Sequence, residues 1–199
     1  MSYDTISLIK QQAKALSKTQ GVSLSSAQEL FARKAKFSNF HDLTTVATRN
    51  PDDPRLVCAA FGVSDLKDAI WEDDLPSQLD DLLEDATSEA RADMNASDFR
   101  VTSLKITSAD YDPALGKLVL DGSFVYGGQQ DLDRMYHGTA FHMNARFNLI
   151  RRFDSWSFDE NTPYEIVDSI TDSDLDREHE LEYQYEQYLA EKAAQAKRE

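Results

Sequence analysis

Apolar residues recur at helical spacing through the first half of the chain. The first such stretch ends at Gly21, a residue suited to the left-handed turn that closes a helix. Ser26 and Glu29 match a capping box, which predicts the start of a second helix. The inward positions of the first helix are Ile6, Ile9, Ala13 and Leu16. The pattern thus predicts two consecutive amphipathic helices.

Shorter and more acidic helices follow. Ser38 or Asn39 is placed to cap a third helix, and Asp53, which precedes a proline, is a suitable start for a fourth. In residues 77–93 the apolar residues fall in a stripe on one side of the predicted helix, so the carboxylates between them are expected to face outward. This stripe consists of Leu79, Leu82, Leu83, Ala86 and Ala90. These features predict a three-helix module over residues 1–50 and an acidic helical segment over residues 51–97.

The period of the pattern changes from helical to alternating after residue 97. Residues 99–107 and 117–126 are rich in β-branched and aromatic side chains, and one parity of the second stretch is apolar. A third stretch has its own apolar parity, Phe141, Met143, Ala145, Phe147 and Leu149. We expect an antiparallel sheet over residues 98–171 and an acidic helix over residues 172–199. The predicted fold class is therefore α+β.

Negative charge is concentrated in two blocks of the sequence. The net charge is −15, of which residues 56–98 carry −10 and residues 159–199 carry −9. Residues 1–55 instead hold eight bases and five acids. Binding of nucleic acid by the whole surface is disfavoured, because phosphates must be met by concentrated Lys and Arg. Any such binding is expected in the N-terminal module.

The stretch "LSSAQELFARKAKFSNFHDL" resembles the small helical module of glyoxalase-related bacterial proteins, over about residues 5–48. The matching residues are Ser25, Ala27, Glu29, Leu30, Ala32, Phe37, Asn39, His41 and Leu43. The sequence departs from that pattern with Lys36 in place of Gly and Phe40 in place of Trp. The module has no set of metal ligands that matches glyoxalase chemistry, so the resemblance implies architecture and no activity. The remainder looks like an uncharacterised protein of a bacterial mobile element.

The acidic helix is the first candidate site. Its carboxylates are spaced so that like charges meet at i, i+4, which destabilises a helix by about 0.2–0.5 kcal/mol per pair. A solvated outer face explains this arrangement. The alternative is a surface that binds a basic partner or imitates the phosphates of a nucleic acid. The residues of this predicted partner-binding face are Asp80, Asp81, Glu84, Asp85 and Glu89.

A long connection between the second and third strands is the second candidate. A hairpin needs only two to five residues, whereas this loop is longer and rich in polar groups. The side chains of Asp131, Asp133 and His137 could ligate a divalent ion, or His137 could exchange protons with a carboxylate. The alternative is an internal network of acidic and basic groups. The candidate loop residues are Asp131, Asp133, Arg134, Tyr136 and His137.

Basic residues of the first two helices form the third candidate. Three lysines are spaced four residues apart along the first helix, and two further bases lie near the end of the second. The spacing permits a helix-turn-helix-like contact with phosphates, although solvated lysines are the usual explanation. The residues of this candidate nucleic-acid face are Lys10, Lys14, Lys18, Arg33 and Lys34.

The sequence favours a non-enzymatic interaction or accessory protein with a basic protein partner. The alternatives are a nucleic-acid-associated regulator that uses the N-terminal module, and a metal-dependent enzyme centred on residues 131–137. No catalytic residue, metal site or cofactor is predicted. The single cysteine excludes a disulfide framework, and no apolar run is long enough for a membrane span or a signal peptide. We expect a cytoplasmic location, no membrane contact, and a dimer as one oligomeric option.

Overall fold

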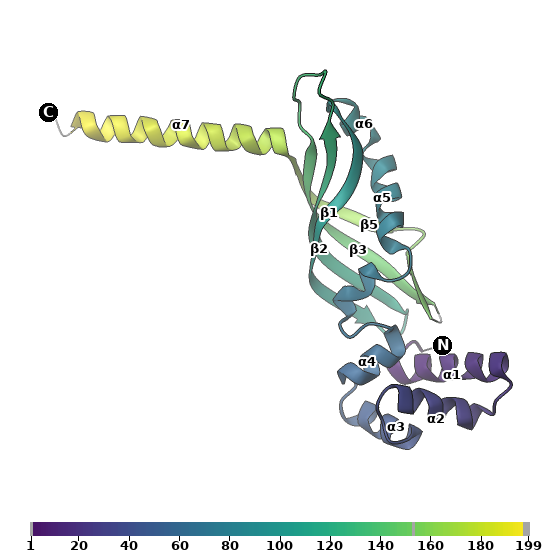
Figure 1. Cartoon of the computed structure of the whole chain (residues 1–199). Helices are drawn as coiled ribbons and strands as arrows, with labels where there is room; N and C mark the ends of the chain where they lie inside the picture. The colour runs from purple at the N-terminus through teal and green to yellow at the C-terminus, as the bar shows by residue number, and fades with distance from the viewer. Residues whose placement is uncertain (1, 153, 197–199) are drawn as a thin grey trace. The chain divides into compact units, whose positions relative to one another are not determined.

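The computed structural model describes residues 2–152 and 154–196 and has the predicted α+β architecture, with a curled antiparallel sheet (Figure 1). The helices are α1 (Thr5–Gln20), α2 (Leu24–Lys34), α3 (Phe40–Arg49), α4 (Pro54–Phe61), the 3-10 helix η1 (Leu66–Trp71), α5 (Leu75–Ala86), α6 (Ser88–Ala92) and α7 (Asp172–Ala196). The strands are β1 (Ala96–Asp112), β2 (Lys117–Gln130), β3 (Ala140–Arg152), β4 (Ser155–Phe158) and β5 (Tyr164–Thr171).

The chain forms two compact units. Unit 1 comprises Met1–Leu79, Lys105–Gly122 and Ala145–Ile166, and unit 2 comprises Asp80–Leu104, Ser123–Asn144 and Val167–Glu199. Helix α5 and strands β1, β2, β3 and β5 each contribute residues to both units. The units therefore divide the chain differently from the four consecutive segments expected from the sequence.

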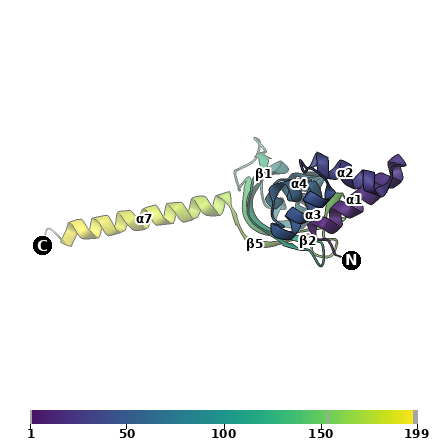
Figure 2. The ribbon, with the colours of Figure 1, turned by 90° about the horizontal axis from the view of Figure 1, so that it is seen from below.

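In unit 1, α1 packs against α2 and α4, and α2 also contacts α3 (Figure 2). The ends of these helices follow the capping signals in the sequence. Gly21 closes α1 with a φ of 65°, Asn39 caps α3 and Asp53 caps α4. The start of α2 differs from the prediction: Ser23 accepts the capping hydrogen bond from the amide of Ser26. The side chain of Glu29 instead accepts a hydrogen bond from the amide of Phe40, at the first residue of α3.

Helix α2 ends in a Schellman motif around Lys36. The amide of Phe37 donates to the carbonyl of Ala32 and the amide of Lys36 donates to the carbonyl of Arg33. Lys36 has a φ of 63°, in the left-handed region that favours glycine. Phe37, which follows it, is buried. The backbone therefore requires the conformation of a glycine at a position where this chain has a lysine.

The sheet has strand order β1-β2-β3-β4, and β5 also pairs with β3. Strands β3 and β4 are antiparallel, with Leu149 opposite Phe158 and Arg151 opposite Trp156. Both apolar parities predicted from the sequence are buried. These buried residues are Leu118, Leu120, Phe124 and Tyr126 on β2, and Phe141, Met143, Ala145, Phe147 and Leu149 on β3.

Each unit has its own aromatic cluster. In unit 1 the rings of Phe61 and Trp156 are stacked with centroids 5.9 Å apart, and the indole of Trp156 donates a hydrogen bond to the carbonyl of Phe61. In unit 2 the ring of Phe99 lies 5.5 Å from Tyr126 and 6.1 Å from Phe141, centroid to centroid. These contacts fix β4 against α4 and join β1, β2 and β3 in the core of unit 2.

The predicted acidic helix is two helices. The chain breaks at Thr87, which is buried and donates its hydroxyl to the carbonyl of Leu83. Leu79 and Leu83 are buried as predicted, whereas Ala86 and Ala90 are exposed. Ala86 is the last residue of α5 and Ala90 lies in α6, and neither faces inward, so the buried stripe is shorter than predicted.

Candidate functional site

Two of the five predicted acidic-face residues have partners within unit 2: Asp80, which is half-buried, and Glu84, which is exposed. The carboxylate of Asp80 accepts a hydrogen bond of 2.7 Å from the amide of Val101 on β1. Glu84 lies 3.5 Å from the guanidinium of Arg91, whose charge sits 5.5 Å above the ring of Phe99. Asp80 therefore ties α5 to β1, and Glu84 pairs with Arg91 between α5 and α6.

The other three predicted residues of this face are free of the core. Asp81, Asp85 and Glu89 are exposed. Because the helix is interrupted at Thr87, Glu89 does not continue the row that Asp81 and Asp85 begin. The outward acidic face of α5 is thus shorter than the sequence suggests.

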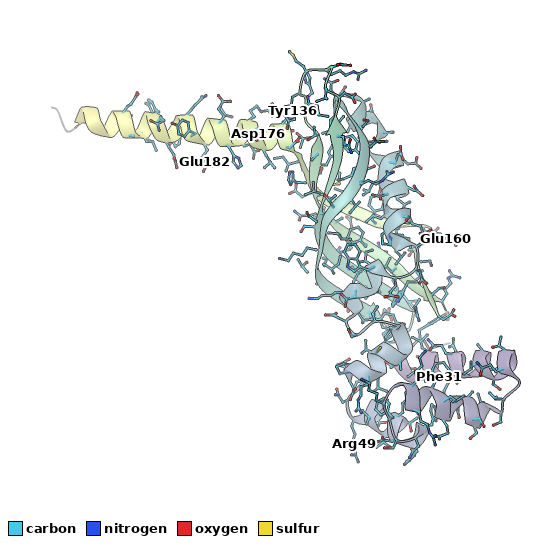
Figure 3. All side chains as sticks on the ribbon, in the orientation of Figure 1. Phe31, Arg49, Tyr136, Glu160, Asp176 and Glu182 are labelled. Carbon is cyan, nitrogen blue, oxygen red and sulfur yellow. The ribbon has the colours of Figure 1, made fainter. Side chains whose placement is uncertain are left out.

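Helix α7 presents a longer acidic surface. Every residue from Asp176 to Lys192 is exposed, and Figure 3 shows Asp176 and Glu182 among the side chains that project from this helix. Four acids follow one another at i, i+4 spacing on α7: Asp174, Glu178, Glu182 and Glu186. Like charges at this spacing repel, which weakens the isolated helix. A partner with positive charge would relieve that repulsion.

An apolar stripe runs along the same helix. Its residues are Leu181, Tyr185, Tyr188 and Leu189, which lie at i, i+4, i+7 and i+8 and are 46–62% exposed. Such spacing is typical of the anchors with which an amphipathic helix enters a groove. Helix α7 therefore combines apolar anchors with a net negative charge.

The first turn of α7 is firmly capped. The hydroxyl of Thr171 accepts a hydrogen bond from the amide of Asp174 and donates one to its carboxylate. Arg177 then pairs with Asp174 at 2.8 Å. The bond from the amide of Asp174 satisfies one of the backbone donors that a helix N-terminus leaves open, and the side-chain contacts hold the cap in place.

Asp172 joins α7 to the loop that precedes β3. Its carboxylate accepts hydrogen bonds from the amide and the hydroxyl of Thr139 and from the hydroxyl of Tyr136. Burial opposes ionisation of Asp172, but these hydrogen bonds outweigh it and hold the pKa of the carboxyl below its ordinary value. Burial and the bond to Asp172 raise the pKa of Tyr136 to about 12.

The loop residues do not converge on one point. Asp131 lies 4.0 Å from Arg134 and accepts a weak hydrogen bond of 3.3 Å from Ser97, while Tyr136 turns to Asp172. Asp133 and His137 are exposed. Over residues 2–152 and 154–196, no group of three or more His, Cys, Asp or Glu side chains is arranged to hold a metal ion.

The tip of the same loop is apolar and exposed. The exposed fraction is 97% for Leu132 and 75% for Met135. The side chain of Asn95 donates a hydrogen bond to the carbonyl of Met135, and the amide of Asp131 donates to the carbonyl of Asn95. The loop is therefore held at its base while its tip faces solvent.

The predicted basic residues of the N-terminal module lie on the surface of unit 1. Lys10, Lys14 and Lys18 on α1 are exposed, and so are Arg33 and Lys34 at the end of α2. Their charges are accessible to a polyanion. Lys34 also lines a pocket that the sequence did not suggest.

This pocket lies within unit 1 and has a volume of about 850 Å³. It is lined by residues of α1, the end of α2, α4, and the turn between β3 and β4. Arg151 reaches it from β3 and is only 3% exposed. Burial lowers the pKa of the Arg151 guanidinium, although the charges of Asp73 and Asp154 act in the opposite direction.

One signal in the sequence could have revealed Arg151. It occupies the next position of the parity that runs from Phe141 to Leu149, and all the apolar residues of that parity are buried. A charged residue at an inward position of a strand needs a partner or a function. The pocket itself is formed by helices that are distant from β3 in the sequence, so the alternating pattern of β3 cannot predict its position.

Comparisons of the chain with protein-family models, with curated proteins and with solved structures find no match. In the described part of the chain, no helix combines the length and the apolarity that a bilayer span requires. The function must therefore be inferred from the surfaces described above.

Proposed function

We propose that this protein is a non-enzymatic interaction protein that uses its acidic helices to bind a basic protein. The observation that carries the proposal is that every residue of α7 from Asp176 to Lys192 is exposed, the apolar stripe included. An amphipathic helix normally buries its apolar stripe, and helices gain most of their stability from that packing. A groove on a partner would bury the stripe of α7.

The charge of α7 favours a basic partner over a second copy of the chain. Between Asp172 and Lys192 the helix has eight acidic and two basic residues. Two such helices in contact would repel, whereas a basic groove would neutralise the row from Asp174 to Glu186. The exposed Asp81 and Asp85 of α5 offer a second acidic contact of the same sign. The proposal also includes the expectation from the sequence that this is a cytoplasmic protein of a bacterial mobile element.

Capture experiments with the full-length protein test it. We expect wild-type protein to retain a basic protein at low salt and to release it at high salt, because screening weakens exposed charges. Tyr185→Ala with Tyr188→Ala should abolish capture by removing the anchors, and Glu178→Lys with Glu182→Lys should abolish it by reversing the charge. Glu160→Lys, an exposed acid between β4 and β5 in unit 1, is the matched control and should leave capture unchanged.

The captured protein is then purified and its affinity for each variant is measured. Equal affinity for the wild type and the α7 variants would contradict the proposal. If duplex DNA displaces this protein from the captured partner, the acidic helices imitate a polyanion, because the partner then binds the DNA and the protein with one surface. Absence of competition would instead support a dedicated protein groove.

Nucleic-acid binding through unit 1 is the second candidate function, favoured by the exposure of Lys10, Lys14 and Lys18 along one helix. Duplex binding measured by fluorescence anisotropy should weaken steeply with salt and be lost in Lys14→Glu. Binding that survives Lys14→Glu would exclude this role for α1.

A further inference from the structure

The pocket of unit 1 is a second feature, independent of the acidic helices. Its volume of about 850 Å³ is that of sites which enclose small organic molecules. Much of its lining is apolar and includes Leu16 of α1, Phe31 of α2 and Pro54 of α4. Such a surface gains free energy when the apolar body of a ligand displaces water from it.

Arg151 gives this pocket a buried positive charge. Its guanidinium donates one long hydrogen bond, 3.3 Å, to the carbonyl of Ala60, and lies 5.1 Å from the centroid of the Trp156 ring. The carbonyl of Ala60 is shared, because the side chain of Gln12 also donates to it at 2.9 Å. Among the described residues, the buried Nε of Arg151 has no hydrogen-bond partner.

The arginine also lacks an acidic partner. In residues 2–152 and 154–196, no carboxylate lies within 4.0 Å of its guanidinium. Arg55, which lines the same pocket, shows the contrast, since it lies 2.9 Å from Asp53 and stacks over the ring of Phe37. Asp73 and Asp154, the second of which lines the pocket, act on this charge without pairing with it. A buried charge without a directly paired counterion costs free energy, and an anion bound to the guanidinium would reduce that cost.

We propose that this pocket binds an organic monocarboxylate, with its carboxylate paired to Arg151 and its apolar body against Leu16, Phe31 and Pro54. A guanidinium matches the two oxygens of a carboxylate with parallel hydrogen bonds. One buried positive charge neutralises one negative charge, so a monoanion fits better than a phosphate dianion. The exposed Lys34 and Lys36, which also line the pocket, attract anions towards it.

Dodecanoate is the probe, with dodecanol and dodecyl phosphate as matched ligands of the same chain length. Isothermal titration of the full-length protein should show saturable binding of dodecanoate. Dodecanol should bind at least tenfold more weakly because it has no charge, and dodecyl phosphate should also bind more weakly. Dodecanol or dodecyl phosphate binding as tightly as dodecanoate would overturn the proposal, and so would absence of dodecanoate binding.

Arg151→Met separates binding from folding. Methionine fills a similar volume without a charge, so the unliganded variant should melt at the same or a higher temperature than the wild type. Its affinity for dodecanoate should fall at least tenfold. An unchanged affinity would overturn the proposal.

A second variant fills the pocket without changing a buried residue. Ala15 is exposed on α1 and lines the pocket, so Ala15→Trp should block dodecanoate. Ala90→Trp, at an exposed alanine of α6 in unit 2, is the control and should bind normally. Dodecanoate binding that persists in Ala15→Trp would place the ligand elsewhere and overturn the proposal.

Cys58 provides an independent readout. It is the only cysteine of the chain, is exposed and lines the pocket. Saturating dodecanoate should slow the alkylation of Cys58 by iodoacetamide several-fold in the wild type and in Ala90→Trp. An unchanged rate in the wild type would contradict occupancy of this pocket.

Discussion

At the scale of single residues, Lys36 is in a conformation that its side chain disfavours. A residue with a Cβ pays roughly 1–2 kcal/mol for the left-handed region, whereas glycine enters it freely. The Schellman motif at the end of α2 nevertheless requires this conformation. The backbone at this position therefore suits a glycine, whereas the chain has a lysine.

Lys36→Gly should therefore stabilise the protein by about 1 kcal/mol, because relief of the strained φ exceeds the added entropy of the unfolded chain. Urea denaturation measures the change. Lys34→Gly is the matched control at a helical position of α2 and should destabilise by about 1 kcal/mol. A loss of stability in Lys36→Gly would show that the lysine side chain makes a compensating contact.

Asp172 should make the stability of unit 2 depend on pH. Its pKa is lower in the folded chain than the ordinary value of 3.8, so its contribution is present above that value. The contribution is lost as the pH falls through the folded pKa, because protonation removes the negative charge that strengthens the hydrogen bonds from Thr139 and Tyr136. Asp172→Asn should cost about 1–2 kcal/mol at neutral pH and flatten the acid-induced loss of stability.

Amide exchange of Thr139, which donates to Asp172, measures this effect locally. Asp176→Asn, at an exposed position of α7, is the control and should leave the exchange rate unchanged. Faster exchange in Asp176→Asn as well would assign the effect to the charge of the helix and not to the bonds of Asp172.

The residues that sequence patterns identify correctly are those governed by their near neighbours. Gly21, Asn39 and Asp53 end or begin helices through contacts within a few residues, so their roles follow from the sequence. The missing partner of the Arg151 Nε does not follow from the sequence. It depends on which carbonyls and carboxylates α4 and the β3–β4 turn bring close to the guanidinium.

At the scale of elements, apolar periodicity predicts the strands and most of the helices, but it does not predict the interruption at Thr87. A hydroxyl at a buried helical position bonds to the carbonyl four residues earlier, a contact that bends helices. The stripe from Leu79 to Ala90 is equally compatible with one helix or two. The structure shows the interruption at Thr87, and both Ala86 before it and Ala90 after it are exposed.

Helix α7 should contribute little to the stability of the remaining chain, since its exposed residues bury almost no apolar surface there. A stop after Glu178 keeps the capped first turn and removes the exposed part. We expect the free energy of unfolding, followed by tryptophan fluorescence, to change by less than about 0.5 kcal/mol. A larger loss would mean that α7 packs against the protein that carries it.

At the scale of the whole molecule, charge repulsion opposes the folded state. The net charge of −15 is concentrated in the regions that form α5, α6 and α7. Added salt screens this repulsion, since the Debye length falls from about 30 Å at 0.01 M to about 3 Å at 1 M. Melting temperature should therefore rise with sodium chloride, and charge-reduced variants at Glu178 and Glu182 should show a smaller rise.

The division into two units could not be predicted from the order of elements along the chain. Strands β2 and β3 each have one buried parity that continues from one unit into the other, so the alternation gives no sign of the division. The α+β class itself followed from the change of period after residue 97, because that signal requires no knowledge of long-range contacts.

The length of α7 has a geometric consequence for any molecule that it holds. A helix of 25 residues extends about 37 Å, and helices of this kind act as semi-rigid spacers. A partner bound near the C-terminal end of α7 would therefore lie several side-chain lengths away from the start of the helix. Deleting whole turns from the helix would shorten this separation in steps of about 5.4 Å.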